Sequence, residues 1–120
     1  MDIIICGNFI EIDIIGEQIR SVVPKHTVVN IQECFTEEQL VKAVNRKKFD
    51  GAIIALDGAE GLEGVNALRE HQKSLPIIWM SNDEQFALIS YRYKVTMFLT
   101  KPYQLDELEE AMIRVMEKHR

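Results

Sequence analysis

The chain has 120 residues, of which 47% are hydrophobic and 28% are charged, and its formal net charge is -5. This length fits one domain of ordinary size, and the acidic balance argues against broad non-specific binding to nucleic acid. No apolar run approaches the ~20 residues of a membrane-spanning helix. Because Asp2 stands where a signal peptide would carry basic residues, we expect a cytoplasmic protein with no membrane-bound part.

Short apolar runs alternate along the chain with stretches whose apolar residues recur at helical spacing. The runs are too short for helices and rich in β-branched residues, which predicts strands. The stretches between them predict amphipathic helices. In chain order, strands are predicted over 3–6, 27–31, 52–56, 76–80 and 96–99, and helices over 12–22, 36–44, 62–73, 81–93 and 105–115.

Two of the predicted helices begin with the spacing of a capping box, in which Glu or Gln follows a hydroxyl residue by three positions. Thr36 and Gln39 predict the start of the second helix, and Ser81 and Glu84 predict the start of the fourth. In this interpretation both hydroxyl side chains accept a hydrogen bond from the first turn of a helix.

Five strands that alternate with crossover helices predict the α/β class, with a doubly wound parallel sheet covered on both faces. No linker or repeat divides the chain, so we expect a single domain over 1–120. Ligands of such sheets bind outside the carboxyl ends of the strands. The corresponding positions are 6–8, 34–35, 55–58, 81–82 and 100–102.

The C-terminal part, LPIIWMSNDEQFALISYRYKVTMFLTKPYQLDELEEAMIRVME, resembles the receiver domain of two-component response regulators. By this resemblance Ser81 takes the hydroxyl position and Phe98 the aromatic switch position. Lys101 takes the place of the phosphate-contacting lysine and Pro102 that of the cis proline. The opening, MDIIICGNFIEI, is similar to receivers attached to LytT-type DNA-binding outputs. The resemblance implies a flavodoxin-like, CheY-like sheet with strand order 2-1-3-4-5.

The chain departs from this family where the family has its acidic residues. Gly7 and Asn8 fall on the acidic pair, and Ala55, five residues after Asp50, falls on the phosphoacceptor aspartate. Mg²⁺ requires carboxylate oxygens and an aspartyl phosphate requires a carboxylate nucleophile, so we expect both to be lost. Asp57 is a possible substitute acceptor, but it would need a two-residue register change in a buried strand.

The retained positions also have simpler interpretations. Ser81 is a candidate helix cap, Phe98 a core aromatic, and Cys6 a small buried hydrophobe. Lys101 is either a solvated lysine or a partly buried one, and a buried lysine without a counter-ion is costly. We therefore predict that Lys101 pairs with Asp57 or turns outward to solvent, and we favour the pair.

Other kinds of site have weaker signals. Cys6 stands about where a phosphocysteine carrier has its nucleophile, but GNFIEID after it is not the Gly-rich turn of a phosphate cradle. No GxGxxG or Walker pattern occurs. His26, His71 and His119 fall in separate elements, so no metal site is expected. The two cysteines do not make a disulfide framework.

We therefore expect a degenerate receiver that works through protein–protein contact, without phosphorylation, cofactor, enzymatic activity or direct binding of nucleic acid. Its partner is another protein or an output domain, and a homodimer through the fourth helix, fifth strand and fifth helix is a candidate assembly. The basic end, EKHR, leaves open that an output domain follows Arg120, as in a transcription regulator. The candidate interface residues are Tyr91, Arg92, Tyr93, Lys94 and Glu109.

Overall fold

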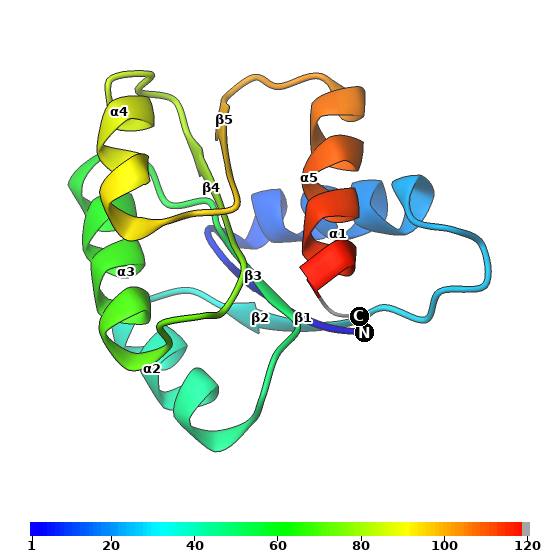
Figure 1. Cartoon of the computed structure of the whole chain (residues 1–120), viewed down its shortest axis with the longest axis horizontal. Helices are drawn as coiled ribbons and strands as arrows, with labels where there is room; N and C mark the ends of the chain where they lie inside the picture. The colour runs from blue at the N-terminus through cyan, green and yellow to red at the C-terminus, as the bar shows by residue number, and fades with distance from the viewer. Residues whose placement is uncertain (119–120) are drawn as a thin grey trace.

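The computed structural model describes residues 1–118, which form a five-stranded parallel sheet between two layers of helices (Figure 1). The strands are β1 Asp2–Cys6, β2 Asn30–Cys34, β3 Gly51–Ile54, β4 Ile77–Ser81 and β5 Met97–Thr100. The helices are α1 Phe9–Val22, α2 Glu37–Arg46, α3 Gly58–His71, α4 Phe86–Ser90 and α5 Leu105–Lys118, with a 3-10 turn η1 Tyr91–Tyr93 after α4. The strand order β2-β1-β3-β4-β5 confirms the predicted α/β fold.

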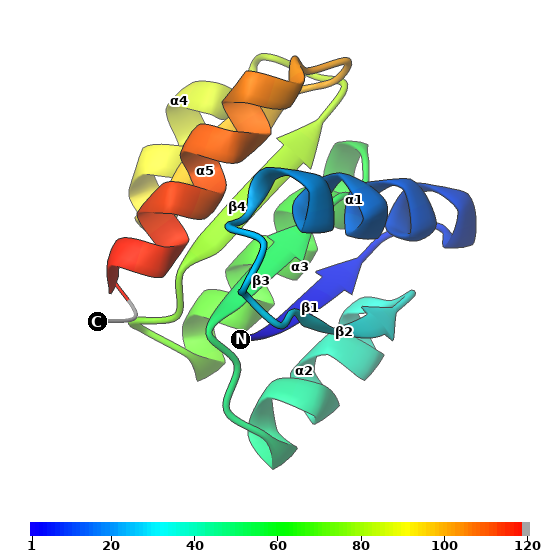
Figure 2. The same cartoon turned by 90° about the vertical axis from the view of Figure 1, so that its right-hand side faces the viewer.

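The alternation of side chains along each strand divides the core into two apolar layers. In β1, Ile3 and Ile5 pack under α1 and α5, whereas Ile4 and Cys6 pack on the opposite face under α2 and α3. Figure 2 shows α1 and α5 together on one face of the sheet. Trp79 of β4 is the largest fully buried side chain, and it lies in the second layer. None of the helices within residues 1–118 combines the length and apolarity needed to cross a bilayer.

The second strand lies three residues later than predicted, at Asn30–Cys34 rather than 27–31. The β-branched run leads into the strand instead of forming it, with Val29 buried against the α1 layer. Strand β2 pairs only with β1, in a register that starts with Asp2 opposite Asn30. An edge strand has a neighbouring strand on one side only and can carry polar residues. The residues NIQEC therefore follow no clear apolar pattern.

The structure confirms the predicted capping box at Thr36 and contradicts the one at Ser81. Thr36 caps α2 as predicted, because its Oγ1 accepts a hydrogen bond from the Gln39 amide at 3.2 Å. Ser81, by contrast, is the buried last residue of β4, and its Oγ accepts from the Asp83 amide at 3.1 Å. The next helix begins only at Phe86. The hydroxyl of Ser81 therefore closes a turn after a strand rather than a helix.

Gly61 lies inside the first turns of α3, which begins at Gly58, four residues before the predicted start of this helix at 62. A Cβ atom at this position would overlap the carbonyl oxygen of Leu56 and stand 3.2 Å from Trp79 Nε1. Gly64, one turn later, would meet only side chains, the nearest being Ile54 Cγ2 at 3.6 Å. The close approach of α3 to the loop after β3 therefore requires glycine at 61 but not at 64.

We predict that Gly61→Ala lowers the free energy of unfolding by about 1–3 kcal/mol, because the added methyl group cannot avoid backbone atoms. Gly64→Ala in the same helix is the matched control. It should leave stability unchanged or raise it by about 0.5–1 kcal/mol through the better helix propensity of alanine. Urea denaturation of both variants measures the difference, and equal effects at the two positions would contradict the close approach.

Candidate functional site

The candidate site lies at the carboxyl edge of the sheet, at the ends of β1, β3 and β5, with β4 between the last two. The Ala55 amide donates to the Cys6 carbonyl oxygen at 2.7 Å, which places Ala55 next to Gly7. The Lys101 ammonium reaches the Ala55 carbonyl oxygen at 2.7 Å from the end of β5. The structure therefore brings together the positions that the sequence assigned to one pocket.

Gly7 and Ala55 form an apolar wall of this pocket. Both are buried, and a Cβ atom at Gly7 would stand only 3.3 Å from the Ala55 Cβ. Strand β3 pairs with β1 up to Ile54 opposite Cys6, so Ala55 is the first residue after the strand, which the sequence predicted to extend to Leu56. No side-chain oxygen is available from either position.

Asn8 is the N-cap of α1. Its side-chain oxygen accepts a hydrogen bond from the Glu11 amide at 2.8 Å, and its Nδ2 donates to Glu11 Oε1 at 2.8 Å. These two bonds use the side chain of Asn8 to start the helix and to orient Glu11. The side-chain amide of Asn8 therefore caps the helix and orients the carboxylate of Glu11.

Lys101 is the centre of the site. Its ammonium lies 2.5 Å from Glu11 Oε2, 2.7 Å from the Ala55 carbonyl oxygen and 3.3 Å from Asp57 Oδ1. The side chain is only 16% exposed. An ammonium has three donors, and here three oxygen atoms face it. The predicted pair with Asp57 is confirmed, and the alternative in which Lys101 turns outward is wrong.

Glu11 is the site residue that the sequence reasoning missed, although it is the nearest carboxylate to Lys101. It comes from α1, 90 residues away in the chain. A signal was present, because Asn8 and Glu11 have the spacing of a helix cap with a reciprocal acidic residue at its third position. The interpretation of Asn8 as a lost metal ligand hid this second role.

Asp57 links three strand ends. It stands on the loop after β3 as the residue before α3, with no hydrogen bond from its side chain into that helix. Its Oδ1 accepts from the Asn82 amide at 3.0 Å, just after β4, and lies near Lys101 at the end of β5. At 42% exposed, its carboxylate is the most accessible of those facing Lys101.

The remaining positions named by the resemblance, Ser81, Phe98 and Pro102, contact Lys101 or the apolar core of the sheet. The Lys101 amide donates to the Ser81 carbonyl oxygen at 2.8 Å, and the Lys101–Pro102 peptide is cis, as the resemblance implied. Phe98 is partly buried and packs edge-to-face on Trp79 with 5.4 Å between ring centroids. This contact agrees with the interpretation of Phe98 as a core aromatic.

Electrostatic effects around the pocket extend to Tyr103, in the segment between β5 and α5. The hydroxyl of Tyr103 donates to Gln18 Oε1 at 2.6 Å beside the pocket. Burial, together with the nearby Glu11 carboxylate, raises the pKa of Tyr103. The tyrosine therefore stays neutral near the Glu11 carboxylate and is bound to α1 through Gln18.

The candidate interface residues follow α4. Tyr91 is 79% exposed, whereas Tyr93 is half-buried and packs against the layer of the core under α2 and α3. Arg69, which the sequence reasoning missed, donates to the carbonyl oxygens of Tyr93 and Lys94 at 2.7 and 3.1 Å. Burial lowers the pKa of this guanidinium. Arg92, Lys94 and Glu109 are exposed.

The donor set at the centre of the pocket does not fit Mg²⁺. The two carboxylates already face an ammonium, and Gly7 and Ala55 supply no oxygen from a side chain. Across residues 1–118, no group of three or more His, Cys, Asp or Glu side chains is placed to hold a metal ion. His119, considered above as a ligand, lies outside the described residues.

Comparison with known proteins identifies one family. The family model for the response regulator receiver domain matches residues 11–113. No curated protein matches the chain in sequence.

Solved structures resemble the fold at low identity. The receiver domain of the sensor histidine kinase PA1611 from Pseudomonas aeruginosa, solved with a coordinated magnesium ion, is 16% identical at a TM-score of 0.73, with 96% of this chain and 97% of that one covered. The receiver domain of AraT from Geobacillus stearothermophilus is 23% identical at a TM-score of 0.75, with 98% and 94% covered. NtrX from Brucella abortus, in complex with ATP, is 17% identical at a TM-score of 0.76, and the match covers 98% of this chain but 27% of NtrX.

We predict that the stability of the fold couples Lys101 to Glu11 more strongly than to Asp57. In double-mutant cycles with Lys101→Met, Glu11→Gln should give a coupling energy of about 1 kcal/mol or more. Asp57→Asn should give about 0.5 kcal/mol, because Asp57 is more exposed and further away.

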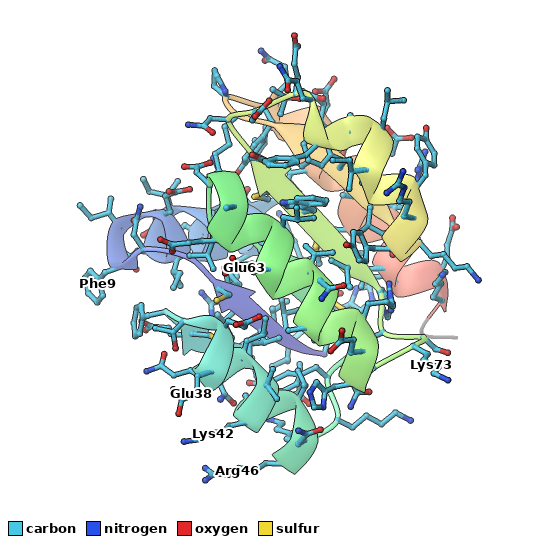
Figure 3. The ribbon with its side chains drawn as sticks, turned by 90° about the vertical axis from the view of Figure 1, so that its left-hand side faces the viewer. Phe9, Glu38, Lys42, Arg46, Glu63 and Lys73 are labelled. Carbon is cyan, nitrogen blue, oxygen red and sulfur yellow. The ribbon has the colours of Figure 1, made fainter. Side chains whose placement is uncertain are left out.

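The pair of Lys42 and Glu38 on the outer face of α2 is the matched control for these cycles (Figure 3). Its side chains are 64% and 79% exposed, so Lys42→Met with Glu38→Gln should couple by less than about 0.5 kcal/mol. If the Lys101 cycles gave no more than this surface pair, Lys101 would not be held by the two carboxylates.

Proposed function

From the premise that this chain belongs to the response regulator receiver domain family, we propose that it is a pseudo-receiver in signal transduction. It acts through protein–protein contact, without aspartyl phosphorylation and without enzymatic activity. The observation that carries this proposal is the Lys101 ammonium, bound to Glu11, Asp57 and the Ala55 carbonyl oxygen. An internal ion network takes the place of the phosphate that this lysine contacts in the family.

The absence of a nucleophile supports the loss of phosphorylation. Formation of an aspartyl phosphate needs a carboxylate at the acceptor position, and Ala55 ends in a buried methyl group packed near Gly7. The loss of Mg²⁺ follows from the same pocket. Asn8 uses its amide to cap α1, so it is not free to replace the carboxylates of the family's acidic pair.

The surface around α4, β5 and α5 is the proposed contact face. Leu88 and Tyr91 are both about four-fifths exposed there, at 80% and 79%, and Arg92, Lys94 and Glu109 are exposed charged residues of the same elements or the turn between them. Exposed aromatic and arginine side chains are typical of protein interfaces. The partner is a second copy of this chain, another protein or an output domain.

The similarity to NtrX, of which the chain matches 27%, supports an origin in a larger regulator. The opening MDIIICGNFIEI is similar to that of receivers in LytT-type transcription regulators, which suggests a DNA-binding output elsewhere in such a protein. The receiver itself has no direct role in binding nucleic acid in this proposal, and it acts in the cytoplasm.

A phosphoreceiver that uses Asp57 is the second candidate. In its favour, Asp57 is 42% exposed and its carboxylate lies 3.3 Å from Lys101, the lysine that would contact a phosphate. Against it, Asp57 follows β3 by three residues and already accepts from Asn82. A phosphocysteine carrier has less support, because Cys6 is fully buried.

Incubation with a small phosphodonor such as acetyl phosphate and Mg²⁺ tests the proposed function. We predict that the intact mass of the chain stays unchanged, since no carboxylate occupies the acceptor position. A stoichiometric acid-labile phosphate would contradict the proposal. The control variants Asp57→Asn and Cys6→Ser then identify the acceptor, because only the variant that lacks it loses the phosphate.

Thermal unfolding tests the loss of Mg²⁺ binding separately. A ligand that binds only the folded state raises the unfolding midpoint with its concentration. We predict the same midpoint in chelator and in millimolar Mg²⁺, with Na⁺ at equal ionic strength as the control. A saturable increase of several degrees with Mg²⁺ alone would show that Asp57 or Glu60 rebuilds a metal site.

A further inference from the structure

The two cysteines of the chain face each other across neighbouring strands, at the same edge of the sheet as the ion network. Cys6 ends β1 and Cys34 ends β2, and they are direct partners in the parallel register. Both side chains point into the layer under α2 and α3. Their sulfur atoms lie 3.3 Å apart, and both are free thiols.

This arrangement satisfies the geometric requirement for a disulfide. Adjacent strands lie about 4.8 Å apart, which falls within the Cα separations of about 4.4–6.8 Å found for disulfide-bonded cysteines. The 3.3 Å between the sulfur atoms has to close to about 2.05 Å. Rotation of the two side chains supplies this movement without a change in the pairing of β1 and β2.

We propose that Cys6 and Cys34 form a modification site, a dithiol that a peroxide converts into an intrachain disulfide and that a thiol reductant restores. The proposal does not depend on the pseudo-receiver function, because it concerns other residues and another chemistry. It gives the domain an input that needs neither a phosphodonor nor a metal ion.

Cys34 is the thiol that attacks the peroxide. The hydrogen bond that joins the two sulfur atoms lowers the pKa of Cys34, and the same contact, with burial, raises the pKa of Cys6. Cys34 also ends the edge strand, between the exposed residues Glu33 and Phe35, so local opening of this strand end admits a small oxidant.

The reaction balances with one peroxide. The Cys34 thiolate attacks one peroxide oxygen, the O–O bond breaks, and the leaving hydroxide takes up a proton as water. The resulting Cys34 sulfenic acid is attacked by the sulfur of Cys6. An S–S bond forms, the S–O bond breaks, and the departing hydroxide takes the Cys6 proton as a second water. The two thiols supply two electrons, and the peroxide is reduced to two waters.

Oxidation of the two thiols affects contacts at the start of α2 and at the residue before the N-cap of α1. The Cys34 thiol donates to the Thr36 carbonyl oxygen at 3.2 Å, and Thr36 is the N-cap of α2. A disulfide removes this donor. The Cys34 carbonyl oxygen also accepts from the Gly7 amide at 3.0 Å, directly before the Asn8 cap that orients Glu11. The dithiol is therefore connected through backbone bonds to the start of α2 and to the ion network.

The experiment exposes the folded chain to hydrogen peroxide, quenches it, unfolds it and counts free thiols. We expect the count to fall from the 2 cysteines of the sequence to none, with the intact mass lower by two hydrogen atoms. Trypsin without reductant should then release the segments 1–20 and 26–42 as one linked species. Dithiothreitol should separate them and restore both thiols.

Cys6→Ser is the matched control, since it leaves Cys34 without its partner and should give a sulfenic acid on peroxide treatment that dimedone traps. The proposal is overturned if both thiols of the natural chain survive peroxide that fully oxidises glutathione. It is also overturned if the products are sulfonic acids or disulfides between chains. These results do not depend on whether the serine variant folds, because they are obtained with the natural chain.

Discussion

The structure of the site depends on one constraint, the need of the Lys101 ammonium for oxygen partners. Its side chain is 16% exposed, so water cannot supply them all, and an unpaired charge there would be costly. Glu11 comes from α1, the Ala55 carbonyl from the end of β3, and Asp57 from the loop that enters α3. One ammonium thus fixes the relative positions of three segments.

The neighbouring residues accommodate this network rather than a ligand. Asn8 caps α1 and aims Glu11 at Lys101, while Gly7 and Ala55 fill the space beside it with backbone and a methyl group. Gly7, Asn8 and Ala55 therefore have identifiable structural roles. In this account the edge keeps one arrangement, and signals reach the domain by contact with partners or by oxidation of its dithiol.

Much of the fold was predictable because buried parallel strands and amphipathic helices leave strong periodic patterns. The edge strand β2 was misplaced, since three of its five residues are exposed and NIQEC follows no apolar pattern. At the site, the sequence predicted Lys101 and Asp57, which stand close to strand ends. Glu11 and the pairing of Cys6 with Cys34 were missed, because both depend on contacts between distant segments that register alone determines.

The most direct test of the central claim is a nuclear magnetic resonance titration of the folded chain with beryllofluoride and Mg²⁺, which together mimic a phosphoryl group in a metal-bound pocket. The amide resonances to follow are those of Asn82, which donates to Asp57, and Lys101, which donates to Ser81. If the internal ion network has replaced the phosphate and the metal, these resonances stay where they are at every concentration. Saturable shifts of both would contradict the account, because they would show that the pocket still binds the phosphoryl mimic.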